Sequence, residues 1–332
     1  MEKMSFWIFK ESRHIDQYIS ILNSDRLNYI QQGDLNKIVS LMNTTDIEKK
    51  NVSLFNKDIE YCFVRLRTED TSAKEHFTDL LIYSIDGSKV KMNVFRGNTN
   101  TTNIIRPYFN QPHWGELGDF KENRLEVTED LLFWLFKMYI DTKTISLSKI
   151  DDIYINALKG YSGVTKDNNN RVRGEGERIS EILGTLAFLL NNDPLKMLRP
   201  KIYFKYGSEN HDILLELKMS GTIKIDSKNY KGSFLGVYSD EELVAILSLL
   251  CSEFIIPKLI QSHKDALLDD RWNISLKKDF LQRIGTEIQN RVQFELIKLN
   301  GEDTENNEDD EDDEDDEYDE ELVEDDGELV EV

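Results

Sequence analysis

The sequence predicts an α+β protein in which mixed or antiparallel sheets pack against helices, followed by a disordered acidic C-terminal tail. Apolar runs lie on both sides of Asp86-Gly87, which is typical of a β-hairpin. In its second half the chain orders its elements as a helix, three strands and two helices, without the βαβ alternation of a parallel sheet. Acidic residues crowd the segment 301–332. These three observations set the fold class.

The first 123 residues are expected to form an α+β region containing a hairpin near 79–95. The expected elements are a strand at 5–9, helices at 15–22 and 35–42, and strands at 59–67, 79–85 and 88–95. The Asp-Gly pair joins the last two strands because it tolerates the positive φ angles of a type I′ turn. Periodicity is lost over 96–123, where we place a domain boundary.

Residues 124–299 are expected to form a second α+β domain that ends in two long helices. The expected elements are a helix at 129–140, an extended segment at 145–158, a helix at 179–190, strands at 201–206, 213–219 and 222–225, and helices at 239–260 and 275–299. Gly and Asn are frequent over 160–176, so we expect a loop without regular structure there. Ser239 and Glu242 have the spacing of a capping box, and Pro257 should kink the helix that follows.

The net charge of −22 belongs almost entirely to the tail. Residues 301–332 contain 21 of the 63 acidic residues and no Lys or Arg, leaving 42 acidic against 41 basic residues in the rest of the chain. Residues 308–317 are all acidic, so this run repels itself and is expected to be disordered. The tail can keep the protein soluble, or it can act as a polyanion that competes with nucleic acid or binds a basic protein partner.

Several features indicate a soluble, cytoplasmic protein. Cys62 and Cys251 both lie in apolar runs, which is typical of buried thiols in a reducing compartment. The first residues lack the basic start and apolar stretch of a signal peptide. The apolar run at 243–252 is about half as long as a bilayer requires, so no membrane partner is expected. The oligomeric state does not follow from the sequence.

The most suggestive candidate site is an anion-binding or nucleic-acid-binding segment before the helix predicted at 179–190. Gly174 and Gly176 form a Gly-x-Gly turn, and a turn at a helix N-terminus can present backbone N–H groups to an anion. The candidate basic residues are Lys159, Lys166, Arg171, Arg173 and Arg178. Neither nucleotide-binding fingerprint is complete, and a capped helix after a flexible loop explains the same pattern. The last predicted helix adds a mild excess of basic residues.

A second candidate is enzymatic. Asp212, Glu216 and Lys218 resemble the carboxylates and lysine of metal-dependent nucleases of the restriction-endonuclease type. Strand alternation places the three side chains on one face, but Asp212 and Glu216 would lie ~13 Å apart on the same strand. They cannot bind one ion without ligands from elsewhere, and a half-exposed strand with a polar face and a core face explains the residues without a metal site. A second carboxylate near Glu216 would favour the nuclease.

No cofactor and no metal site are expected, since the five histidines are scattered without ligand spacing. The high share of Asn, Lys and Ile is typical of AT-rich genomes, whose accessory and phage-defence proteins have similar compositions. Two hypotheses remain. The first is a non-enzymatic intracellular protein that binds nucleic acid, or a protein associated with nucleic acid, and carries a regulatory acidic tail. The second is a metal-dependent nuclease or another phosphate-processing enzyme.

Overall fold

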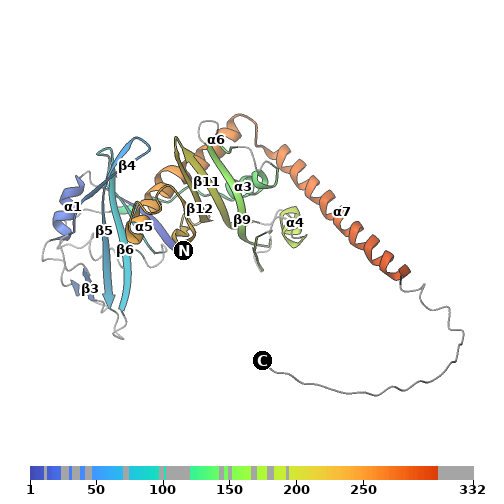
Figure 1. Ribbon diagram of the computed structural model, residues 1–332, viewed down its shortest axis with the longest axis horizontal. Coiled ribbons are helices and arrows are strands. Elements are labelled where there is room, and N and C mark those ends of the chain that lie inside the picture. Colours follow the sequence, from blue (N-terminus) through green and yellow to red (C-terminus); the bar gives the residue numbers. More distant parts are fainter. Residues whose placement is uncertain are drawn as a thin grey trace, which may run out of the picture. The chain divides into compact units, whose positions relative to one another are not determined.

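A computed structural model describes most of the chain (Figure 1). The described residues are 1–10, 13–23, 30–31, 38–41, 47–69, 75–96, 101, 120–141, 146–148, 152–165, 170–177, 183–191 and 194–305. The chain divides into two compact units, Met1–Gly285 and Thr286–Val332. Among the described residues, the first unit holds the strands and every helix but the last, of which it holds residues 274–285.

The strands of the first unit form one continuous sheet whose pairings are all antiparallel. Its strands are β1 (Glu2–Phe9), β2 (Ile30–Gln31), β3 (Ile38–Leu41), β4 (Lys50–Leu54), β5 (Lys57–Glu69), β6 (Glu75–Ile85), β7 (Lys91–Val94), β8 (Phe120–Glu122), β9 (Asp152–Val164), β10 (Arg171–Glu175), β11 (Leu195–Tyr206), β12 (Glu209–Lys218), β13 (Ile223–Ile225) and β14 (Lys231–Gly232). Helices pack against this sheet, so the α+β class is confirmed.

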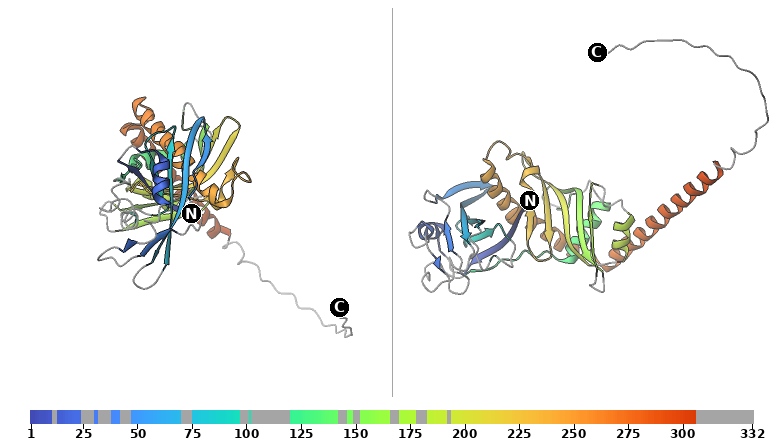
Figure 2. Two further views of the ribbon diagram at one scale, coloured as in Figure 1. Left: turned by 90° about the vertical axis from the view of Figure 1, so that its left-hand side faces the viewer. Right: turned by 90° about the horizontal axis from the view of Figure 1, so that it is seen from below.

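The N-terminal strand joins the two halves of the sheet. Residues 2–4 of β1 pair with β13, whereas residues 5–8 pair with β7. Figure 2 shows β1 passing between the strands of the N-terminal half and those of the C-terminal half. The boundary that we placed near residue 123 separates these two sets of strands along the chain, apart from β1, and lies inside the first unit.

Helices pack on the sheet in both halves, and in the N-terminal half they lie on both of its faces. The helices are α1 (Ile15–Leu22), α3 (Glu129–Asp141), α4 (Leu183–Leu190), α5 (Asp240–Leu249), α6 (Ile256–Leu268) and α7 (Ile274–Glu305), with a π-helix at Leu250–Ile255 and a 3-10 turn at Ser227–Asn229. Helix α3 is apolar on most sides and packs on β9 and β11 (Figure 1). In the N-terminal half, Phe9, Tyr18 and Cys62 belong to one buried core.

The hairpin predicted at Asp86-Gly87 is confirmed. Asp86 and Gly87 have φ angles of 49° and 66°, as a type I′ turn requires, and β6 pairs with β7 around them. The capping box is also confirmed, because the Ser239 hydroxyl accepts from the Glu242 N–H and the Glu242 side chain accepts from the Ser239 N–H. Both cysteines are buried and free, as expected.

The helix predicted at 35–42 is wrong. Residues 38–41 form strand β3, which pairs with β5. The apolar spacing of this segment suits a helix, but Ile38-Val39 has strong β propensity and the neighbouring long strand supplies a backbone partner. Residues 35–37 and 42 lie outside the described residues.

The loop predicted at 160–176 is wrong as well, because β9 continues to Val164 and residues 171–175 pair with it as β10. The glycines here permit close packing instead of breaking the strands. A Cβ on Gly163 would lie 2.3 Å from the Phe188 ring, and a Cβ on Gly174 would lie 2.3 Å from the Tyr161 ring. The segment expected to be extended over 145–158 corresponds to β9, which begins at Asp152.

The long helix predicted at 239–260 changes its hydrogen-bonding pattern just before Pro257. The Ile256 N–H donates to the Cys251 carbonyl, which is an i to i−5 bond of the π-helix, and Pro257 then lies in the first turn of α6. Proline is tolerated in a first turn because its missing N–H is not needed there. The run Asp240–Leu268 is long and apolar enough to span a membrane, yet 72% of its most apolar window is buried, as in the core helix of a soluble protein.

Helix α7 extends beyond the predicted 275–299, to Glu305. Its residues from 286 onward belong to the second unit, where the side chains of Phe294, Ile297 and Leu299 are exposed. The predicted disorder of the tail concerns residues 300–332. Of these, 300–305 are helical, and 306–332 lie outside the described residues.

Candidate functional site

The strand register of the C-terminal half aligns basic side chains on the sheet face opposite to α3. In antiparallel pairs, residues directly opposite each other point to the same face. Along β11 the buried residues Pro200, Ile202 and Phe204 alternate with more accessible ones. The accessible residues are Arg199, Lys201, Tyr203 and Lys205. We call the side on which they lie the basic face.

One hollow on the basic face, which we call the Arg173 hollow, follows directly from the register. Arg173 of β10 lies opposite Ser162 of β9, Ser162 lies opposite Met197 of β11, and Met197 lies opposite Lys218 of β12. The hollow encloses about 630 Å³. Its charged lining residues are Arg171, Arg173, Lys196, Lys218, Lys224 and Glu216, which is five basic side chains against one carboxylate.

The single carboxylate of the Arg173 hollow is surrounded by cations. Glu216 Oε1 lies 2.9 Å from Lys224 Nζ and 3.2 Å from Lys218 Nζ, and Glu216 Oε2 lies 4.0 Å from Arg199 Nε. Burial of the carboxyl would raise its pKa, but hydrogen bonds from Lys224 and Lys218 outweigh burial, so the pKa lies below its usual value. Glu216 is therefore ionised and neutralises part of the positive charge.

The row of basic side chains continues from the hollow to the first strand. Lys3 of β1 lies opposite Lys224 of β13, and Lys224 lies opposite Glu216. Burial lowers the pKa of Lys3, and repulsion from Lys218 and Lys224 lowers it further. The cations of β1, β12 and β13 are thus close enough to repel one another, and an anion placed among them would relieve this repulsion.

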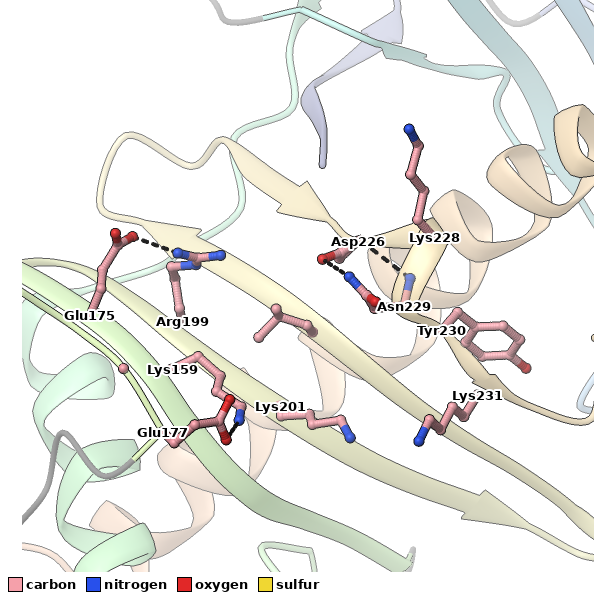
Figure 3. A pocket seen from close by; sticks show the side chains of 12 residues that line it. Lys159, Glu175, Glu177, Arg199, Lys201, Asp226, Lys228, Asn229, Tyr230 and Lys231 are labelled. Carbon is pink, nitrogen blue, oxygen red and sulfur yellow. Dashed lines mark hydrogen bonds and ion pairs between the residues drawn. The ribbon is translucent and has the colours of Figure 1, made fainter. Parts of the chain in front are cut away.

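A second hollow, which we call the Lys201 hollow, lies on the same strands and is shown in Figure 3. It encloses about 640 Å³, and its charged lining residues are Lys159, Arg199, Lys201, Lys228, Lys231, Glu175, Glu177 and Asp226. Lys201 and Lys231 extend toward each other in Figure 3. Arg199 Nη1 lies 2.5 Å from Glu175, and a Cβ on Gly160 would come within 3.1 Å of the Arg199 side chain. Glycine at 160 thus leaves room for this ion pair.

The structure brings together part of the residue set predicted from the sequence. Arg171 and Arg173 line the Arg173 hollow together with Lys218, whereas Lys159 lines the Lys201 hollow and pairs with Glu177. Arg173 also pairs with Glu175 at 2.6 Å. Lys166 and Arg178 lie outside the described residues. The Gly-x-Gly turn does not open a helix in the described chain, because Gly174 belongs to β10 and α4 begins at Leu183.

The basic residues at the start of the last helix have other partners. Lys277 Nζ lies 4.3 Å from the centroid of the Phe133 ring and 4.0 Å from the Asp130 carboxylate. Arg283 pairs with Asp141. Both contacts hold α7 against α3, so these two side chains contribute to packing instead of to the basic face.

The carboxylates of the enzymatic alternative have separate partners. Asp212 Oδ2 lies 2.8 Å from Lys201 Nζ, whereas Glu216 binds Lys218 and Lys224. Within the part of the chain that the structure describes, no three His, Cys, Asp or Glu side chains are grouped so that they could hold a metal ion. Glu216 was expected on a half-exposed face, but it is 4% exposed. Its neighbours are cations, which makes it a charge-compensating group.

The contributions of β11 and β13 to the basic face were not predicted from the sequence. Arg199, Lys201 and Lys224 each contribute a cation to the basic face. The sequence does contain an indication of this face on β11, because cations and Tyr203 alternate with apolar residues from 199 to 205. The neighbours of these strands, however, depend on pairings between segments distant in sequence, such as β9 with β11 and β1 with β13.

Comparison with known proteins adds no functional information. No protein-family model matches this chain, and no curated protein matches its sequence. The function is therefore inferred from the geometry of the basic face alone.

Proposed function

We propose that this protein is a non-enzymatic, cytoplasmic binding protein that engages nucleic acid through the basic face. One observation supports this most strongly: Arg171 and Arg173 of β10 line one hollow together with Lys196, Lys218 and Lys224, which come from three other strands. Phosphate groups are the natural ligands of such a cluster, because arginine and lysine side chains donate charge-assisted hydrogen bonds to their oxygens.

The distribution of charge favours a polyanion over a small anion. The two hollows lie on adjacent strands and together contain ten basic residues and four carboxylates. Residues 1–300 as a whole are nearly neutral, with 42 acidic and 41 basic residues, so the basic face concentrates positive charge locally. A chain of phosphates can contact both hollows at once, whereas a single phosphate can occupy only one.

Binding is favoured over hydrolysis because the carboxylates on this face are used as ion-pair partners. Glu216 and Asp212 each bind at least one lysine, and their charges reduce the repulsion between neighbouring cations. The nuclease alternative requires two carboxylates that converge on one site. The ion-pair partners of Glu216 among the described residues are the cations Lys218, Lys224 and Arg199, and Glu175 is linked to Glu216 only through Arg199, which pairs with both.

The test is a salt titration of binding to labelled DNA and RNA by the full chain. We expect binding to weaken as salt rises, and the double variant Arg171→Ala/Arg173→Ala should bind more weakly with a shallower salt slope, because fewer phosphates are neutralised. Arg271→Ala is the matched control, since Arg271 pairs with Asp269 two residues away much as Arg173 pairs with Glu175. The control should leave affinity and slope unchanged.

Two outcomes would overturn the proposal. Absence of salt-sensitive binding to any nucleic acid would remove nucleic acid as a direct ligand and leave a protein partner in its place. Equal losses of affinity for nucleic acid in the double variant and in Arg271→Ala would show that binding does not depend on the Arg173 hollow.

A further inference from the structure

Beside its cations, the basic face carries two aromatic rings. Tyr203 of β11 lies directly opposite Tyr154 of β9, and their ring centroids are 6.1 Å apart. Both side chains are partly exposed, whereas the adjacent Ile153, Ile155 and Ile202 are buried on the other face. The two tyrosines are therefore available to a ligand that approaches the sheet from the side of the hollows.

Lysines and two aspartates flank this pair, and the Tyr154 hydroxyl donates to the Asp152 carboxylate at 3.3 Å. Lys201 and Lys205 precede and follow Tyr203 at the period of a strand, so all three side chains share one face. On the other side, Tyr203 lies opposite Asp212, which lies opposite Lys231. Lys201 and Lys231 line the Lys201 hollow, where the partly exposed Leu214 adds apolar surface between them.

We infer that the Tyr154–Tyr203 pair is a stacking platform for the unpaired bases of a single-stranded nucleic acid, whose phosphates contact Lys201, Lys205 and Lys231. This inference rests on the proposed function and specifies its ligand. Aromatic side chains within a positively charged groove bind single strands because every base has a face that can stack, whereas the bases of a duplex are already stacked on one another. A duplex can therefore use the cations of the basic face but not the two rings.

The experiment compares a labelled thymidine strand of about 16 nucleotides with a duplex of the same length, using the full chain at constant salt. Tyr203→Ala should weaken binding to the single strand about fivefold or more and leave duplex binding within about twofold. Tyr203→Phe keeps the ring and should bind both ligands like the unaltered protein. Phe77→Ala is the matched control, because Phe77 is a half-exposed aromatic residue on β6, in the other half of the sheet.

The outcomes separate this inference from the proposed function. If Arg171→Ala/Arg173→Ala weakens binding of both ligands while Tyr203→Ala weakens neither, or weakens both equally, the stacking platform is refuted and the proposed function stands. If neither ligand binds, the proposed function has failed first. Should Tyr203→Ala lower the melting temperature, Tyr154→Ala on the neighbouring strand provides the same test with the same expected losses.

Discussion

Glu216 and Lys224 form an ion pair, at 2.9 Å, between two strands that are joined by a tight turn. Only 6% of the Glu216 side chain is exposed, whereas 29% of Lys224 is. The carboxylate therefore lies beneath its cationic partners and reduces the repulsion among Lys3, Lys218 and Lys224. This arrangement couples the stability of the sheet to the charge that the basic face presents.

Removal of the Glu216 charge should destabilise the fold. Glu216→Gln keeps the shape of the side chain but leaves Lys218 and Lys224 without a compensating carboxylate. We expect a loss of about 1–3 kcal/mol in the free energy of unfolding, since the pair is partly buried but its lysines remain accessible to solvent. Urea denaturation measures the loss. Glu287→Gln on α7 is the control, and a loss as small as that of the control would mean that Glu216 is not compensating buried charge.

Acid should remove the Glu216 contribution. The pKa of this carboxyl is lower in the folded than in the unfolded chain, so the folded state binds fewer protons. Its stabilisation is therefore present above the unfolded value of about 4.5 and is lost as the pH falls below it. Denaturation of the protein and of Glu216→Gln at several pH values should show their stabilities converging in acid. A constant difference down to pH ~2 would contradict the shift in pKa.

His211 should produce a second pH dependence at higher pH. Its ring is fully buried beside Phe234, and burial lowers its pKa from 6.5 to about 4. The unfolded chain therefore binds the proton first, so stability is complete above pH 6.5 and falls as the pH approaches 4, by at most about 1.4 kcal/mol per pH unit.

The test of this dependence is His211→Phe, which retains the ring contacts but loses the hydrogen bond to Tyr230. This variant should be less stable at neutral pH and show a shallower decline between pH 6.5 and 4. His14→Gln is the control because His14 is 55% exposed. If the stability of His211→Phe still falls by the full amount between pH 6.5 and 4, a group other than His211 causes this fall.

Local signals explain which parts of the fold could be predicted from the sequence. The Asp86-Gly87 turn and the Ser239 capping box depend on residues within a few positions of each other, and both are confirmed. The predictions at 35–42 and 160–176 were wrong because tertiary pairing overrode local composition. Strand β3 forms on the edge of β5, and Gly163 and Gly174 make room for aromatic rings instead of interrupting β9 and β10.

The candidate site was less predictable than the fold. Arg171 and Arg173 were identified, but as part of a loop leading into a helix. Their approach to Lys218 depends on the order β10-β9-β11-β12, and the contribution of Lys3 depends on the pairing of the first strand with β13. Such pairings join segments up to more than 200 residues apart and leave no local pattern in the sequence.

Loss of the helix cap at Ser239 should have a modest effect. Ser239→Ala removes the hydroxyl that accepts from the Glu242 N–H, so we expect a loss of about 1 kcal/mol in the free energy of unfolding. The control is Ser53→Ala at an exposed position of β4, where the change should stay within about 0.5 kcal/mol. Urea denaturation distinguishes the two values. Equal losses would mean that the cap does not contribute to stability.

Removal of the acidic tail should strengthen binding to nucleic acid. Helix α7 ends at Glu305, so the deletion that leaves this helix intact is 306–332, which removes 18 acidic and no basic residues and changes the net charge from −22 to −4. A polyanion on the same chain competes with phosphates for the basic face. We therefore expect tighter binding at low salt and a difference that fades as ions screen both competitors within ~10 Å at about 0.1 M.

A second form of the tail separates charge from length. Replacing the ten acidic residues 308–317 with Asn and Gln keeps the length of the chain and removes the densest block of charge. This variant should strengthen binding at low salt in the same direction as the deletion, and both effects should become smaller when Arg171 and Arg173 are changed to Ala. Salt titrations of the full chain, the deletion and the neutral tail, each with and without the two arginines, against one labelled single strand measure these differences. If the deletion strengthens binding and the neutral tail does not, steric exclusion by the tail, and not competition by its charge, limits access to the basic face.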